Sequence, residues 1–69
     1  MQHWEYKMVD SYGGREVTGI DHEKVNQKPL PKVLDYLNQL GREGWEVVGF
    51  ASHSGVNEYV LKRPLLYEG

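Results

Sequence analysis

One amphipathic segment near the middle of the chain limits the possible folds more than any other feature. Four apolar residues follow the three–four spacing that stacks side chains on one face of a helix: Val33, Leu34, Leu37 and Leu40. Pro29 and Pro31 stand just upstream, and proline suits the first turn of a helix because its missing N–H would have no intrahelical partner there. Gly44 fits the left-handed position that ends many helices. The sequence therefore predicts one helix, entered at the two prolines and capped at Gly44.

Side-chain alternation predicts a strand at the start of the chain. Trp4, Tyr6 and Met8 fall on one face of residues 4–11, and the residues between them fall on the other. Two glycines at positions 13 and 14 then tolerate positive φ, which predicts a turn. Residues 15–20 can return as a short second strand, whereas residues 21–27 are mostly polar and predict a loop.

The segments after the helix predict a hairpin. Residues 45–52 and 58–63 are rich in β-branched and aromatic side chains, and a short loop separates them. We therefore expect an α+β fold, in which a small antiparallel sheet of three to four strands, in ββαββ order, has one helix packed on one face. Residues 1–69 are expected to form a single domain, because the chain is too short for a second one.

Apolar side chains on both faces of the sheet predict self-association. In the strand after the helix, we expect Trp45 and Val47 to point one way and Val48 and Phe50 the other. One helix covers only one face, and a chain of 69 residues without cysteine has no disulfide to compensate for a small core. A homodimer or higher oligomer would bury the second face. The alternatives are that the tail at residues 65–67 folds back over the sheet, or that some apolar groups stay exposed.

Charge and hydropathy exclude two classes of partner. The formal net charge of −2 gives no reason to expect duplex nucleic acid, which requires a basic face. No apolar stretch of the sequence approaches the roughly 18 residues of a membrane span. The first residues also lack the apolar core of a signal peptide. We therefore expect a cytoplasmic protein that binds neither a membrane nor duplex nucleic acid.

Three segments of the chain resemble a bacterial and phage family. They are WEYK at residues 4–7, LNQLGREGWEVV at residues 37–48 and YVLKRP at residues 59–64. In this order and spacing they are similar to the family catalogued as domain of unknown function 4177. The resemblance implies a compact β/α domain and carries over no catalytic residue. Residues 13–28 lie outside the three segments, and we expect any particular activity to reside there.

Patterns for catalysis and metal binding are weak in this sequence. His3, His22 and His53 have no partner at the spacing of a metal-binding pair, and no serine lies in a nucleophile elbow. Glu46 and Glu58 could face each other across the hairpin, but cross-strand ion pairs with nearby lysines are the favoured interpretation. We therefore expect no enzyme activity, no metal and no cofactor.

Positive charge gathers before the helix, where it opposes folding because a helix N-terminus carries partial positive charge. Such a local conflict points weakly to a function. An anion such as phosphate would be stabilised there by the helix dipole, by free backbone N–H groups and by cationic side chains, while an aromatic ring could stack on a base. The candidate ligand-binding residues are Arg15, Lys24, Lys28, Lys32, Tyr12 and Trp4. The opposing interpretation is a solvated, lysine-rich loop.

Two functions follow from these observations. The first is a non-enzymatic, self-associating domain that binds a small anionic or nucleotide-like ligand, and that could sequester a signalling nucleotide as in phage counter-defence. The alternative is a protein–protein interaction module that uses the uncovered sheet face or an edge strand such as residues 15–20. Single-stranded nucleic acid on an aromatic sheet is a weaker third, because the acidic balance argues against the required basic groove.

Overall fold

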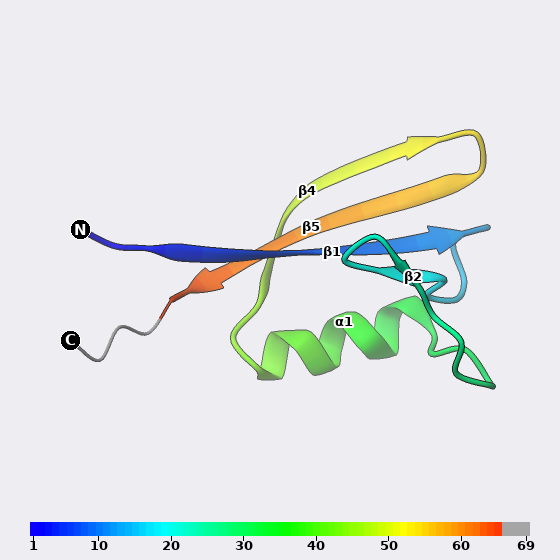
Figure 1. The fold of residues 1–69 in the computed structure, drawn as a ribbon, viewed down its shortest axis with the longest axis horizontal. Coiled ribbons are helices and arrows are strands. Elements are labelled where there is room, and N and C mark those ends of the chain that lie inside the picture. The colour runs from blue at the N-terminus through cyan, green and yellow to red at the C-terminus, as the bar shows by residue number, and fades with distance from the viewer. Residues whose placement is uncertain (66–69) are drawn as a thin grey trace.

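The computed structural model describes residues 1–65, so positions 66 and 67 of the predicted tail lie outside it. The elements follow one another as β1 (Trp4–Tyr12), β2 (Gly19–Ile20), β3 (Glu23–Lys24), α1 (Val33–Arg42), β4 (Glu46–His53) and β5 (Val56–Pro64). The strands form one antiparallel sheet in the order β3-β2-β1-β5-β4 (Figure 1). The predicted α+β class is thus confirmed. No helix among the described residues is long and apolar enough to cross a membrane.

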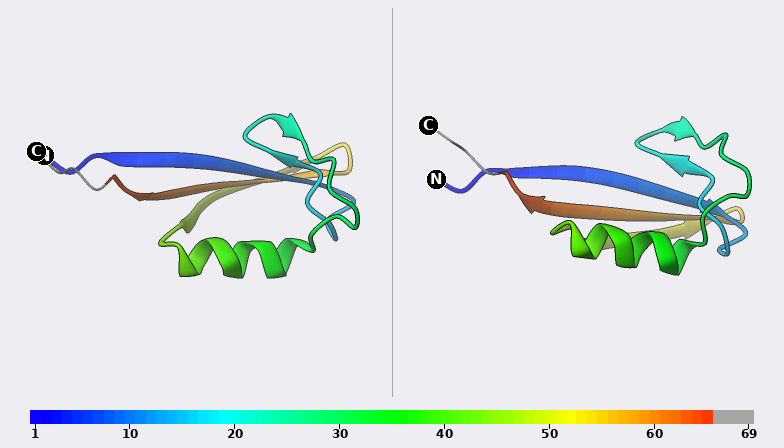
Figure 2. Two further views of the ribbon diagram at one scale, coloured as in Figure 1. Left: turned by 60° about the horizontal axis from the view of Figure 1, so that its bottom comes forward. Right: turned by 90° about the horizontal axis from the view of Figure 1, so that it is seen from below.

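β1 and β5 form the centre of the sheet and decide which side chains are buried. Their pairing runs without interruption from Trp4 opposite Pro64 to Tyr12 opposite Val56. α1 lies along one side of these long strands (Figure 2). On that side Val9 is fully buried, whereas Tyr12 on the opposite side is 70% exposed. We call the side opposite α1 the open face; its β1 residues are Trp4, Tyr6, Met8, Asp10 and Tyr12. The predicted alternation in the first strand is confirmed.

α1 forms where the sequence predicts a helix and contributes two residues to the core. Val33 and Leu40 are buried, and Gly44, with a φ of 94°, follows the last turn as expected. Leu34 departs from the prediction and is 69% exposed. Leu34 lies about 100° round the helix from the buried Val33 and therefore leaves the core-facing side. Tyr36 packs against the core instead. The core comprises Val9, Val17, Val33, Leu40, Trp45 and Leu61.

The sheet contains five strands, so the expectation of three to four was too low. Of residues 15–20, only Gly19–Ile20 belong to a strand, and β3 lies in the segment predicted as loop. Asp21 and His22 form the turn between β2 and β3 with φ values of 51° and 69°, the combination that two-residue hairpin turns favour. Because β3 is exposed and polar, no apolar alternation marks its pairing with β2.

A β-bulge in β4 changes the faces on which its side chains lie. The pairing with β5 shifts after Val47, so that Val47 lies opposite Leu61 and Phe50 lies opposite Tyr59. Leu61 and Tyr59 both face α1, and so Val47 and Phe50 share that side too. The expectation that they point to opposite faces was wrong, because the extra residue, Val48, interrupts the two-residue period.

An arginine connects the two central strands to the end of α1. Arg63 Nε donates to Glu5 Oε2 at 3.0 Å, and its Nη1 donates to the carbonyl of Glu43, also at 3.0 Å. The Arg63 guanidinium lies 4.4 Å from the centroid of the buried Trp45 ring, and Lys7 approaches the same ring at 5.4 Å. These residues come from the three segments that carry the family resemblance. The segments therefore meet in one structural cluster, the Arg63 cluster.

Removing the guanidinium from the Arg63 cluster should weaken the fold. Arg63→Ala is expected to lower the free energy of unfolding by about 1–3 kcal/mol, through the loss of charge-assisted hydrogen bonds and ring contact. Arg63→Lys should recover only part of this loss, because an ammonium group cannot reproduce the planar fork. Urea unfolding followed by tryptophan fluorescence measures both variants. Arg42→Ala, at the exposed end of α1, is the control, and equal effects at positions 42 and 63 would contradict the assignment.

The carboxylate of Asp21 connects the β2–β3 turn to β1. Burial raises its pKa, but hydrogen bonds from the Met8 N–H and from Lys7, together with the Lys7 charge, outweigh that effect and lower the pKa below its ordinary value. The Lys7 Nζ to Asp21 Oδ2 distance is 3.0 Å, and the Met8 N–H donates to Oδ1 at 2.9 Å. The ionised carboxylate therefore stabilises the folded state.

This lowered pKa predicts a stability difference that depends on pH. Asp21→Asn should cost about 0.5–1 kcal/mol of unfolding free energy at pH 7. The difference should shrink as pH falls below about 4, the ordinary aspartate range, because the wild-type carboxylate is then progressively protonated in the folded state too. Urea unfolding from pH 7 to pH 2 measures it, with Glu23→Gln as control. A difference that stays constant down to pH 2 would refute the role of the charge.

Candidate functional site

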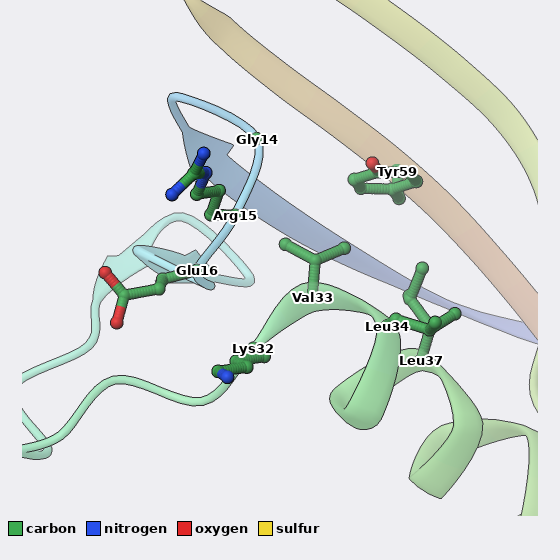
Figure 3. Close-up of a pocket in the computed structure, with 8 residues that line it drawn as sticks. All are labelled: Gly14, Arg15, Glu16, Lys32, Val33, Leu34, Leu37 and Tyr59. Atoms are coloured by element: carbon green, nitrogen blue, oxygen red, sulfur yellow. The ribbon is translucent and has the colours of Figure 1, made fainter.

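A hollow of about 750 Å³ lies between the start of α1, the turn after β1 and the middle of β5. Its lining residues, shown in Figure 3, are Gly14, Arg15, Glu16, Lys32, Val33, Leu34, Leu37 and Tyr59. We call it the α1–β5 hollow. Two of the candidate ligand-binding residues, Arg15 and Lys32, thus lie in the wall of one cavity.

Backbone pairing brings the segments that carry these two cationic residues side by side, although they are distant in the sequence. The Val33 N–H donates to the Arg15 carbonyl at 3.0 Å, and the Val17 N–H donates to the Pro31 carbonyl at 2.8 Å. Between these bonds, Glu16 and Lys32 form an isolated antiparallel bridge. Residues 15–17 therefore run beside residues 31–33, at the entrance to α1.

The glycine turn after β1 makes this arrangement possible. Gly13 and Gly14 have φ values of 83° and 81°, a conformation that other residues rarely adopt. A Cβ at position 14 would also approach Asn57 Nδ2 to 2.9 Å. Across the turn, the hydroxyl of buried Ser11 at the end of β1 donates to the Glu16 carbonyl at 2.7 Å. The turn thus directs residues 15–17 back toward the helix and fixes them there.

The hollow has an apolar part and a charged part. Val33, Leu34 and Leu37 gather on α1 and face the ring of Tyr59 on β5, whereas Arg15 lies beside the turn and Glu16 and Lys32 lie near the entrance to α1 (Figure 3). The apolar surface continues beyond the hollow, because the Phe50 ring lies 5.1 Å from the Tyr59 ring. A ligand in the hollow would meet aromatic and aliphatic carbon at one end and charge at the other.

The electrostatics of the charged part favour an anion. Arg15 and Lys32 have no ion-pair partner within residues 1–65, and Glu16 is the single acidic residue of the lining. Lys32 is also the N-cap of α1 and makes no side-chain capping hydrogen bond. The partial positive charge of the helix N-terminus adds to these cations. One of the expected free amides is not free, however, because the Val33 N–H is bonded to Arg15.

The other candidate residues lie elsewhere. Lys24 lines a separate hollow beside the β2–β3 hairpin, and Lys28 lines neither cavity. Tyr12 is exposed on the open face. Trp4 lies at the far end of β1, where the Lys62 ammonium sits 4.0 Å from its ring centroid. The six candidates therefore do not form one site.

The pairs considered from the sequence for catalysis and metal binding do not come together among the described residues. Glu46 lies opposite Lys62 and Glu58 opposite Ala51, so the two carboxylates do not face each other across the hairpin. His53 Nε2 lies 3.4 Å from a Glu58 oxygen, a cross-strand pair exposed to solvent. Within residues 1–65, no three His, Asp or Glu side chains gather as metal ligands would. These polar side chains are accounted for by pairing within the sheet.

Six lining residues were absent from the sequence-based candidates, and two of them, Tyr59 and Leu34, supply much of the apolar wall. Tyr59 was treated as a strand residue and Leu34 as a core residue. The signal for Leu34 was its position beside Val33, which turns it away from the face shared by Val33 and Leu40. Nothing in the local pattern could indicate that Tyr59 lies near Arg15.

One protein-family model matches the chain over residues 4–63, and its description is a domain of unknown function (DUF4177). The match includes residues 13–28, which lie outside the three short segments of resemblance. The α1–β5 hollow is thus built entirely from residues within the matched range. No curated protein and no solved structure matches the chain.

Proposed function

Because this chain belongs to the DUF4177 family, whose function is unknown, we propose a function from its own surface. In this proposal the chain is a non-enzymatic, self-associating domain that binds a small anionic, nucleotide-like ligand in the α1–β5 hollow. Binding is stoichiometric and leaves the ligand unchanged. Such a protein is suited to sequestering a signalling nucleotide, as a phage would require against a host defence.

The observation that carries this proposal is the pairing of two cations with an aromatic wall in one cavity. Arg15 and Lys32 offer charge-assisted hydrogen bonds to phosphate oxygens. Tyr59 and the leucines of α1 offer a surface on which a base can pack. A nucleotide has the same division into an anionic and an aromatic part.

The size and chemistry of the hollow support binding rather than catalysis. Its volume of about 750 Å³ falls within the roughly 300–1,000 Å³ typical of small-molecule sites. Its lining contains no histidine, serine or cysteine, and so lacks the Ser–His or Cys–His pair of many hydrolases. Glu16 alone is an acid, and it stands beside Lys32 in the backbone bridge.

Charge reversal in the hollow should abolish anion binding. Titration calorimetry with adenosine diphosphate and with inorganic pyrophosphate is expected to show binding of both by the wild type. Arg15→Glu combined with Lys32→Glu should weaken both by at least about tenfold, or 1.4 kcal/mol. The control is Lys24→Glu combined with Lys28→Glu, which makes the same change of net charge outside the hollow. Equal losses in the two double variants would refute the site.

A third variant separates the aromatic contribution from the ionic one. Tyr59→Leu keeps an apolar side chain but removes the ring. It should weaken the binding of adenosine diphosphate more than the binding of pyrophosphate. Native mass spectrometry of the protein purified gently from cells provides an independent test, because a nucleotide-sized added mass identifies the ligand. If neither probe binds at millimolar concentration and no added mass is found, the proposal is wrong.

The protein-interaction alternative has a specific observation in its favour. Tyr6 and Tyr12 are exposed by 64% and 70% on the open face, and tyrosine is enriched at protein–protein interfaces. The edge expected for this role, residues 15–20, is not an edge, because β2 lies between β1 and β3. Tyr6→Ala with Tyr12→Ala would abolish capture of a protein partner and leave calorimetric ligand binding unchanged.

A further inference from the structure

The two edges of the sheet differ sharply. β3 forms one edge with only two residues, Glu23 and Lys24, both charged and exposed. Short, charged edge strands are a common protection against pairing with another chain. β4 forms the other edge with eight residues, EVVGFASH, among which there is no lysine, arginine or proline. Within residues 1–65 nothing pairs with the outer side of β4.

β4 also exposes several large apolar side chains beside its unpaired edge. Val47, Val48 and Phe50 are 44%, 46% and 59% exposed, although β4 is paired along its inner side. Val47 and Phe50 face the side of α1, and exposed Leu34 lies on α1 itself. α1 leaves this part of its own side of the sheet uncovered. An occupant that pairs with the β4 backbone would also bury these apolar groups.

We infer that β4 pairs antiparallel with β4 of a second copy of this chain, which makes one continuous sheet with five strands from each copy. This inference rests on the self-association in the proposed function and specifies its surface. A two-fold axis perpendicular to the sheet relates the copies, so the same strand serves both partners. Both α1 helices then lie on the same side of the joined sheet, with the exposed apolar side chains between them.

The charges of β4 are complementary under this symmetry. The strand carries its one acidic residue, Glu46, at its first position and its one imidazole, His53, at its last. With Phe50 at the two-fold axis and the bulged Val48 skipped on each strand, Glu46 lies opposite the partner's His53. His53 Nε2 already lies 3.4 Å from Glu58 Oε1 of its own copy, so the partner's Glu46 would accept from the other ring nitrogen, and the imidazolium form can donate to both carboxylates. This register also keeps Val47 and Phe50 on the side of α1, as the pairing with β5 requires.

The open face is a poorer surface for a second copy. At its centre Asp10 of β1 lies directly opposite Glu58 of β5, so two carboxylates are neighbours there. Asp10 Oδ1 has no hydrogen-bond partner in the described structure, and the partner of Glu58 is the exposed His53. Two open faces packed together would bury two pairs of neighbouring carboxylates, and Asp10 Oδ1 in each copy would have no partner, which is strongly unfavourable. The β4 edge carries no such obstacle.

Sedimentation equilibrium of the whole protein and of two matched variants tests the inference. The wild type is expected to be a dimer at micromolar concentration. Phe50→Lys, at a side chain already 59% exposed in the single chain, should raise the dimer dissociation constant at least about tenfold. Tyr6→Lys also introduces a lysine in place of an exposed aromatic residue, but on the open face, and should leave the dimer dissociation constant unaltered. Circular dichroism establishes that both variants remain folded.

A cysteine cross-link provides the second measurement, because the natural chain contains no cysteine. Phe50→Cys should form an intermolecular disulfide under mild oxidation, since directly opposed residues of antiparallel strands have Cα atoms about 4.5–5.5 Å apart, within the range that a disulfide spans. Tyr6→Cys should not. A wild-type monomer at 100 μM would overturn both the self-association and the β4 surface. A dimer that survives Phe50→Lys but dissociates with Tyr6→Lys would overturn the β4 surface alone. Neither result depends on the ligand titrations.

Discussion

The rest of the structure depends on the pairing of β1 with β5. These strands lie at opposite ends of the sequence, and all their residues are paired from Trp4 with Pro64 to Tyr12 with Val56. β2 attaches to one side of the pair and β4 to the other, and α1 packs across it. The Arg63 cluster then binds the same two strands to the end of the helix. The core therefore depends on contacts between residues far apart in the sequence, an arrangement associated with slower folding than local contacts.

Those parts of the fold that depend on local pattern could be predicted from the sequence. The helix repeat around Val33 and Leu40, the alternation from Trp4 to Met8 and the glycine after the helix each depend on near neighbours. The missing parts lack such a pattern. β3 has two exposed polar residues that pair only through their backbone. The bulge at Val48 depends on how β4 fits β5, and an alternating pattern contains no information about an extra residue.

In the candidate site, too, local sequence features predicted some parts and long-range pairing decided the others. The kinds of side chain near the helix entrance suggested an anion, and Arg15 and Lys32 do meet at one cavity. Which of the cations would meet could not be predicted, because that depends on the pairing of residues 15–17 with residues 31–33. Tyr59 reaches the cavity from the last strand, and no short-range pattern relates it to Arg15. Trp4 and Tyr12 alternate onto the open face, away from the hollow.

The outer ends of the central strand pair also lie side by side. The Leu65 N–H donates to the His3 carbonyl at 2.8 Å, so the backbone before β1 and the backbone after β5 are neighbours. The domain could be inserted into a surface loop of a host protein without forcing that loop apart, since both connections leave from the same corner. The same proximity would allow the chain to be closed into a ring by a short linker and reopened at the Ser54–Gly55 turn.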